Sequence, residues 1–160
     1  MSEDRDLVLT PIGRVVRGRP RGAKDDRWQE ATAEIEIVPA WAEALDGIEG
    51  FSHIWVVWWL DRFDRPPASP KVHPERRQDM PLVGLFATRS PHRPNPIALT
   101  AVRLVERRGR RLRVEGLDAF EGTPVLDLKP YLQRGDLIPE ATMPAWLEQL
   151  WRSHDEEREP

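Results

Sequence analysis

Apolar and polar residues alternate along this chain in short runs, and such runs predict β-strands. Residues 31–38 place alanine and isoleucine on one face and glutamate on the other, which is typical of a half-buried strand. Residues 53–60, H-I-W-V-V-W-W-L, are apolar on both faces and predict a central strand that is covered on both sides. Further runs predict strands at 82–88, 97–105, 111–117 and 125–128, with a hairpin turn at Arg108-Gly109.

Two segments have helical spacing instead. Residues 39–45 predict a short helical turn, and residues 143–153 place two tryptophans and two leucines on one helical face. Residues 62–80 are rich in proline, arginine and aspartate without periodicity, and they predict a mobile loop. The fold class is therefore mainly β: a small single-domain β-barrel with short helices and a C-terminal helix. The predicted parts are a flexible N-terminus (1–9), the barrel domain (10–139) and a C-terminal helix with a charged tail (140–160).

The tryptophans of the central strand point to a partner. The bulky side chains of Trp55, Trp58 and Trp59 would leave a large apolar patch exposed if the outer face of this strand were uncovered. A partner subunit could cover that patch.

Composition narrows the class of protein. The chain has 160 residues, 39% of them hydrophobic, and contains no cysteine, so disulfides, thiolate metal sites and thiol nucleophiles are excluded. The start lacks the pattern of a signal peptide and no apolar run approaches the roughly 20 residues of a membrane helix, which predicts a cytoplasmic protein that does not span a membrane. The histidines have no metal-ligand spacing, so we expect no metal.

Arginines are unevenly distributed, although the net charge is −3. They form two groups that could each provide a basic patch for RNA or could simply be solvated. The first group contains Arg14, Arg17, Arg19, Arg21, Lys24 and Arg27, and the second contains Arg103, Arg107, Arg108, Arg110, Arg111 and Arg113.

Residues 84–100 form a loop that prolines stiffen. Pro91, Pro94 and Pro96 fix their own φ angles and favour extended backbone at the residues before them. A pre-ordered loop would present Arg89 and Arg93 to a carboxylate or phosphate at a small entropic cost. The alternative is a structural crossover at the edge of a sheet.

Three segments carry a resemblance to a known family. They are F-S-H-I-W at 51–55, F-A-T-R-S-P-H-R-P-N-P-I at 86–97, and D-A-F-E-G-T-P-V-L-D-L-K-P-Y at 118–131. These segments resemble the signature motifs of the TsaA-like family, also called TrmO-like. The resemblance implies a small β-barrel and an S-adenosylmethionine-dependent methyltransferase that acts on the exocyclic nitrogen of threonylcarbamoyl-adenosine in tRNA. Because members of this family are commonly dimers, it also implies a homodimer.

The resemblance also implies a set of site residues. Those expected to contact the cofactor are Arg89, Asp118, Ala119, Phe120 and Glu121, with Leu99 and Thr100 in the wall and Asp61 and Arg62 beside it. Asp127, Lys129 and Tyr131 are the candidates near the proton that the amine loses. Arg93 and His53 are candidates for substrate or RNA binding.

Several of these residues have a structural alternative. Asp127 and Lys129 could pair with each other at the strand surface, Tyr131 could be a packed ring, and His53 could bond to the backbone. Two other functions also stay open. The same fold could methylate a small molecule or another RNA, or it could be a non-catalytic module that binds S-adenosylmethionine.

Overall fold

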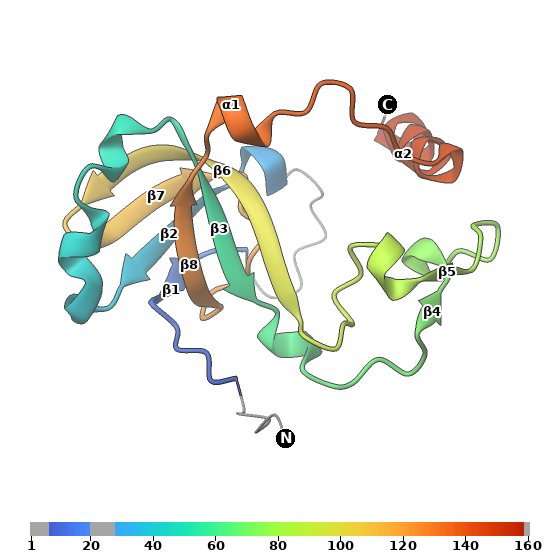
Figure 1. Cartoon of the computed structure of the whole chain (residues 1–160), viewed down its shortest axis with the longest axis horizontal. Helices are drawn as coiled ribbons and strands as arrows, with labels where there is room; N and C mark the ends of the chain where they lie inside the picture. Colours follow the sequence, from blue (N-terminus) through green and yellow to red (C-terminus); the bar gives the residue numbers. More distant parts are fainter. Residues whose placement is uncertain (1–6, 20–27, 159–160) are drawn as a thin grey trace, which may run out of the picture. The chain divides into compact units, whose positions relative to one another are not determined.

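The computed structural model describes residues 7–19 and 28–158, and it confirms the mainly β architecture (Figure 1). Contacts divide the chain into two units. The first, which we call the barrel unit, comprises Met1–Asp64 and Asn95–Tyr131, and the second unit comprises Arg65–Pro94 and Leu132–Pro160. Residues 1–6 of the predicted flexible N-terminus and the end of the predicted tail lie outside the described residues.

The barrel unit contains a closed barrel of antiparallel strands in the order β1-β2-β7-β6-β3-β8. Closure pairs every one of these strands on both sides, which satisfies the backbone hydrogen bonds that an open sheet leaves at its edges. The strands are β1 (Gly13–Arg17), β2 (Thr32–Ile37), β3 (His53–Trp59), β6 (Ile97–Arg108), β7 (Arg111–Glu115) and β8 (Pro124–Pro130). Short 3-10 helices of this unit are η1 (Trp28–Glu30), η2 (Pro39–Leu45), η3 (Ile48–Gly50) and η4 (Asp61–Phe63).

Alternation along the strands fills the barrel. Ile35 of β2, Ile54 of β3 and Leu112 of β7 are all 0% exposed, so each contributes its full side chain to the core. Trp58 points inward from the same face of β3 as Ile54, and its Nε1 donates to Thr100 Oγ1 at 3.1 Å. A buried indole N–H usually needs such an acceptor.

The outer face of β3 is apolar, as the pattern predicts. Trp55, Val57 and Trp59 are half-buried there, and the register places Ile97 and Leu99 of β6 opposite Trp59 and Val57. Ile97 and Leu99 are exposed. The homodimer that would cover this face stays a prediction.

The second unit is built from short elements. They are β4 (Lys71–Val72), η5 (Pro74–Arg76), β5 (Val83–Gly84), η6 (Leu85–Ala87), α1 (Gln133–Asp136) and α2 (Ala145–Arg158), and β4 pairs with β5. Met80, Leu85 and Leu150 of α2 are buried in it. The helix predicted at 143–153 is confirmed, but it begins two residues later and continues five residues further, through Arg158.

Three sequence predictions need correction. The strand expected at 82–88 is wrong beyond β5, because the chain turns at Leu85 into η6 and Thr88 N bonds back to Leu85 O at 3.1 Å. The loop expected at 62–80 contains η4, β4 and η5. Strand β1 was not predicted, since its five residues carry only two apolar side chains.

Candidate functional site

Antiparallel pairing brings four segments to one end of the barrel. Arg14 of β1 pairs with Pro124, Trp58 of β3 pairs with Val125, and Trp59 pairs with Ile97. The end of β1, η4, the start of β6 and the loop before β8 therefore meet at this end. We call the site residues there the barrel-end cluster: Gly18, Arg19, Asp61, Arg62, Asp118, Ala119, Phe120 and Glu121. Six of these eight were predicted as cofactor contacts.

The segment from Asp118 to Glu121 is held by residues after β1. Arg19 N donates to Ala119 O at 2.8 Å, and the Arg19 guanidinium reaches one Asp118 carboxylate oxygen at 2.7 Å. Gly18 permits this approach, because a Cβ at that position would lie 2.5 Å from Ala119 O and 3.1 Å from Glu121 N. The carboxylate of Asp118 is thus oriented by its own chain rather than left free to rotate.

Charge at this end of the barrel is mixed. The Arg62 guanidinium carbon lies 4.0 Å from the centroid of the Phe120 ring, which is close cation–π geometry. Asp61 and Glu121 are exposed, and within the described parts of the chain neither side-chain carboxylate forms a hydrogen bond or ion pair. Two carboxylates therefore remain available to a cationic ligand, beside an aromatic ring.

Not every predicted contact is equally accessible. Ala119 is 0% exposed, so it supports the segment from within. Leu99 and Thr100 lie on opposite faces of β6, since Thr100 faces the interior and accepts from Trp58 while Leu99 is 56% exposed on the outside. A single ligand in this structure would touch at most one of these two side chains.

The candidates for proton transfer lie elsewhere on the barrel. Asp127 and Lys129 form an ion pair at 2.9 Å on the outer face of β8, opposite Val57 and Trp55. The carboxylate of Asp127 also accepts from Leu128 N at 2.9 Å. This arrangement matches the structural alternative, in which the two residues pair with each other.

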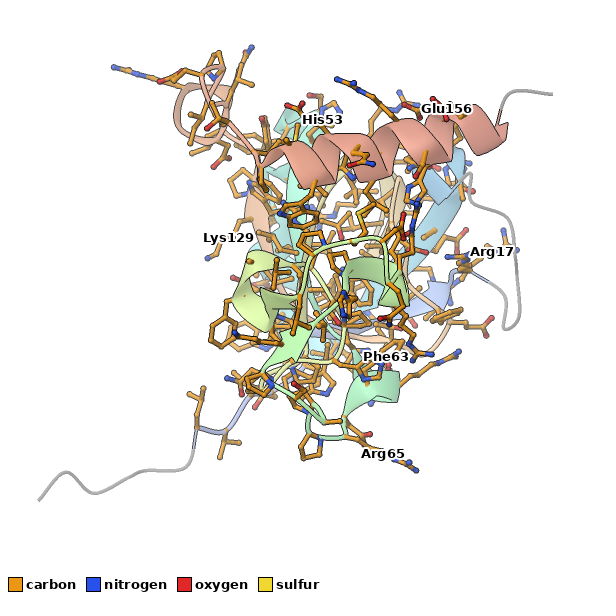
Figure 2. All side chains as sticks on the ribbon, turned by 90° about the vertical axis from the view of Figure 1, so that its right-hand side faces the viewer. Arg17, His53, Phe63, Arg65, Lys129 and Glu156 are labelled. Carbon is orange, nitrogen blue, oxygen red and sulfur yellow. The ribbon has the colours of Figure 1, made fainter. Side chains whose placement is uncertain are left out.

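Tyr131 and His53 lie together at the end of the barrel away from the barrel-end cluster. Tyr131 N donates to His53 O, and the Tyr131 ring lies 5.5 Å from the Trp55 ring. Figure 2 shows His53, at the start of β3, near the top of the view, and Phe63 of η4, which follows β3, in its lower half. The six strand steps from His53 to Trp59 span roughly 20 Å, and Trp59 lies at the end of β3 near the barrel-end cluster. Within one chain, His53 and Tyr131 are therefore remote from Asp118.

The proline-stiffened loop binds one of its own arginines. Arg93 Nη1 donates to the carbonyls of Thr88 at 2.8 Å and Leu85 at 3.2 Å, and the guanidinium lies over the Phe86 ring at 5.7 Å. Arg93 therefore stabilises the loop. Arg89 is exposed and forms no hydrogen bond or ion pair with any other described residue, so it alone of the pair is available to an anion.

The second arginine group is mostly neutralised. Arg107 is 16% exposed and binds Asp46 at 3.1 Å and Glu49 at 3.0 Å. Arg103 pairs with Glu115 in the same way. Ion pairs also engage Arg108, Arg110, Arg111 and Arg113. In the first group, Arg21, Lys24 and Arg27 lie outside the described residues.

Sequence reasoning missed Gly18 and Arg19 as site residues. Arg19 reaches Asp118 across 99 positions of the chain, and no local pattern encodes such a contact. The signal available in the sequence was Gly18 itself, because a glycine allows two backbone segments to pass close to each other.

Among the residues that the structure describes, no group of three or more histidine, cysteine, aspartate or glutamate side chains is placed to hold a metal ion. Likewise, no helix within the described ranges has the length and apolar character needed to cross a membrane.

The chain is similar to known proteins in both sequence and structure. The family model described as tRNA-methyltransferase O N-terminal domain matches residues 15–137. A crystal structure of TrmO from Pseudomonas aeruginosa superposes with a TM-score of 0.66 at 30% identity, covering 88% of this chain and 63% of that one.

Two curated relatives are similar in sequence. A probable S-adenosyl-L-methionine-binding protein of Archaeoglobus fulgidus is 44% identical over 77% of this chain and 32% of its own length. A tRNA (adenine(37)-N6)-methyltransferase of Homo sapiens is 41% identical over 84% of this chain and 32% of its own length. The chain therefore spans about a third of the length of each of these relatives.

Proposed function

Because the chain belongs to the tRNA-methyltransferase O N-terminal domain family, we propose that it is an S-adenosylmethionine-dependent methyltransferase that modifies adenosine in tRNA. The observation that carries the proposal is the match of the family model to residues 15–137, which contain the whole barrel-end cluster. The names of the relatives from Archaeoglobus fulgidus and Homo sapiens support the cofactor and the reaction.

The barrel-end cluster fits this cofactor in its chemistry. Bound S-adenosylmethionine supplies a methyl group on a positively charged sulfur. Asp61 and Glu121 offer carboxylates to cationic groups, and Phe120 offers a ring face. Asp118, held by Arg19 at 2.7 Å, offers an oriented acceptor for a hydroxyl or ammonium group. The chain mainly has to bind and orient, since in-line displacement needs positioning more than covalent catalysis.

The finer assignments are also part of the proposal. The target is the exocyclic nitrogen of threonylcarbamoyl-adenosine, the protein works in the cytoplasm, and it is a homodimer that buries the outer face of β3. Arg89 remains a proposed cofactor contact, as does one of Leu99 and Thr100, whose side chains lie on opposite faces of β6. The other proposed roles are proton transfer for Asp127, Lys129 and Tyr131, and substrate or RNA binding for Arg93 and His53.

Two measurements test the proposal in order. Calorimetric titration with S-adenosylmethionine should show binding at one site per chain. Transfer of labelled methyl to tRNA from a strain that lacks the gene should then show catalysis. Binding without transfer would favour a non-catalytic module, and absence of binding would contradict the proposal as a whole.

Asp118→Asn should weaken cofactor binding roughly tenfold, which corresponds to about 1.4 kcal/mol. The amide keeps the shape of the carboxylate but loses the charge that holds Arg19 and receives polar ligand groups. Calorimetry of the variant against the wild type measures the effect. Asp79→Asn is a matched control in the second unit, where the hydrogen bond from Arg77 holds the pKa of Asp79 below its usual value. Equal affinities for Asp118→Asn and wild type would argue against the assignment.

Arg103→Gln should leave tRNA affinity within about twofold of wild type. Its guanidinium is committed to Glu115 at 2.9 Å, and a cation already paired contributes little to binding a phosphate. Filter binding of tRNA at two salt concentrations measures affinity and its salt dependence. A marked loss of affinity, with a shallower salt dependence, would instead restore the β6–β7 hairpin as an RNA-binding surface.

A further inference from the structure

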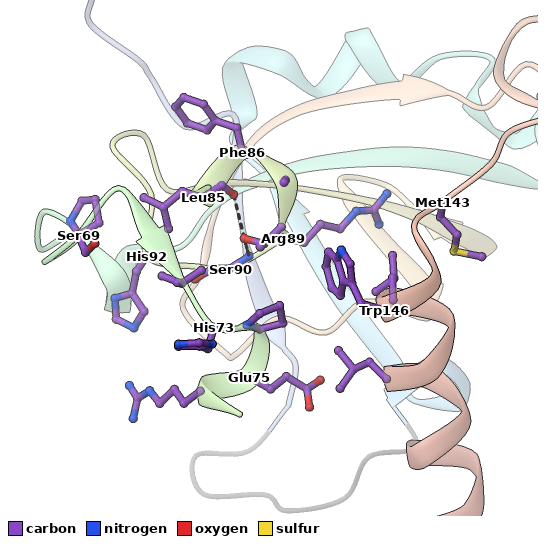
Figure 3. A pocket seen from close by; sticks show the side chains of 18 of the residues that line it. Ser69, His73, Glu75, Leu85, Phe86, Arg89, Ser90, His92, Met143 and Trp146 are labelled. Atoms are coloured by element: carbon purple, nitrogen blue, oxygen red, sulfur yellow. Dashed lines mark hydrogen bonds between the residues drawn. The ribbon is translucent and has the colours of Figure 1, made fainter. Parts of the chain in front are cut away.

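Two cavities of the chain differ in their relation to the proposed cofactor site. The cavity in the second unit lies between the chain at 67–92 and α2, and Arg89, a proposed cofactor contact, is part of its lining (Figure 3). The other, of about 580 Å³, lies within the barrel unit and contains no residue of the barrel-end cluster. We call it the barrel groove, and its lining comes from Ile12, from residues between 37 and 51, and from 127–130 of β8.

The barrel groove is apolar and its wall is held in place. Ile37 and Leu45, which are both buried, line it together with the exposed rings of Trp41 and Phe51. The segment that carries Leu45 is fixed by Arg107, whose guanidinium donates to Leu45 O at 2.9 Å. Because this wall is ordered beforehand, an apolar segment that enters the groove has to order only itself.

The charged residues that line the barrel groove are already paired. Asp46 binds Arg107 at 3.1 Å, and Asp127 binds Lys129 at 2.9 Å. Within the described lining these pairs account for every charged side chain. The groove therefore favours an uncharged, apolar occupant over an anion or a cation.

The segment before β1 has the complementary character. We call residues 7–11 the N-terminal arm, and its sequence, L-V-L-T-P, carries no charge. Leu7 and Val8 are 85% and 82% exposed, and Leu9 is exposed as well. The arm leads away from the barrel at the start of β1 (Figure 1). Three consecutive apolar side chains in water form a surface that a protein partner covers favourably.

The direction of the arm is set by Ile12. Ile12 N donates to Val125 O at 2.8 Å, and Ile12 O accepts from Val38 N at 2.9 Å. Pro11, directly before this anchored residue, has a fixed φ angle. Ile12 lines the barrel groove of its own copy, yet the arm leaves that groove uncovered. A second copy of the chain is therefore the source of an arm for the groove.

We propose that the N-terminal arm of one copy docks in the barrel groove of a second copy, so that two copies exchange their arms. The inference rests on the homodimer of the proposed function. Asp127 and Lys129 of the groove lie opposite Val57 and Trp55 of β3, so the groove borders the face that the homodimer buries. An extended arm spans roughly 17 Å, and the partner's groove has to lie within this reach. Reciprocal exchange closes the dimer about a two-fold axis.

Disulfide trapping tests which copy supplies the arm, because the chain has no cysteine of its own. Val8→Cys places a thiol on the arm, and Ala44→Cys places one on the groove lining. The two single variants are mixed, equilibrated and oxidised, and we expect a covalent dimer in which peptide mass spectrometry finds position 8 linked to position 44. Thr32→Cys is the control partner, since Thr32 is exposed at the end of β2 away from Ile37, and it should give much less linkage.

The contribution of the arm to dimer formation is measured by analytical ultracentrifugation. Val8→Asp should raise the dimer dissociation constant at least about tenfold, because docking would bury a charge. Val8 is 82% exposed, so this change leaves the fold of each chain intact. Trp41→Ala should raise the constant at least about fivefold. Trp151→Ala is the matched control, with 52% exposure against 53% for Trp41 but outside the groove, and it should stay close to wild type.

Three outcomes would overturn the inference. The first is a disulfide within one chain in the double variant Val8→Cys/Ala44→Cys, which would show that the arm docks in its own groove. The second is linkage between positions 8 and 44 no greater than with Thr32→Cys. The third is an unchanged dissociation constant in both Val8→Asp and Trp41→Ala.

Failure of the proposed function gives a different set of results. A wild-type dimer that exchanges arms yet transfers no methyl group keeps the docking groove and removes the reaction. A dimer that transfers methyl and is indifferent to both Val8→Asp and Trp41→Ala keeps the reaction and removes arm exchange. Wild type that stays monomeric at every concentration removes the homodimer and arm exchange together, whatever its methyltransferase activity.

Discussion

Gly18→Ala is expected to lower the free energy of unfolding by about 1 to 3 kcal/mol and to remove most cofactor binding. The added Cβ would stand 2.5 Å from Ala119 O and 2.7 Å from Val15 Cγ1, closer than real Cβ contacts allow. The chain can relieve this only by moving the end of β1 away from the segment at 118–121. That movement would break the bond from Arg19 N to Ala119 O and displace Asp118.

Gly50→Ala is the matched control for this substitution. A Cβ at Gly50 meets no atom within 4 Å, so the same chemical change should leave both stability and cofactor affinity close to wild type. Urea unfolding and calorimetry measure the two quantities. If Gly18→Ala bound the cofactor as wild type does, the barrel-end cluster would not be the cofactor site.

Ile54→Ala is expected to cost about 2 to 5 kcal/mol of stability. Ile54 is 0% exposed at the centre of the barrel, where β3 pairs with both β6 and β8, so its loss leaves a cavity that neighbouring strands cannot fill. The melting temperature should fall by about 2 to 4 °C for each kcal/mol. Leu82→Ala, at a position that is 55% exposed and lies outside the barrel, should change stability by less than about 0.5 kcal/mol. Similar melting temperatures for the two variants would contradict this account of the core.

The strands with strong periodicity could be predicted from the sequence. Residues 31–38 and 53–60 carry alternating or fully apolar patterns, and they form β2 and β3 within a residue or two. The fold class followed from the number and spacing of such runs. In contrast, residues 82–88 look apolar enough for a strand, but only Val83 and Gly84 find a pairing partner, and the rest turns into η6.

The site could be predicted only in part. The motif at 118–121 identified a segment whose position the structure explains, yet the residues that fix that position, Gly18 and Arg19, are about a hundred positions earlier. Arg89 and Arg93 looked equivalent in sequence. Only the fold distinguishes them, because the carbonyls of Leu85 and Thr88 turn towards Arg93 and occupy one of its nitrogens.

Labelled methyl transfer from S-adenosylmethionine to tRNA from a strain that lacks the gene, followed by nucleoside analysis, tests the proposed methyltransferase activity most directly. We predict label in an adenosine-derived nucleoside with wild-type protein and with Asp79→Asn, and much less label with Asp118→Asn at limiting cofactor. Label in threonylcarbamoyl-adenosine would also establish the finer target. Cofactor binding with no label in any tRNA nucleoside would contradict the account.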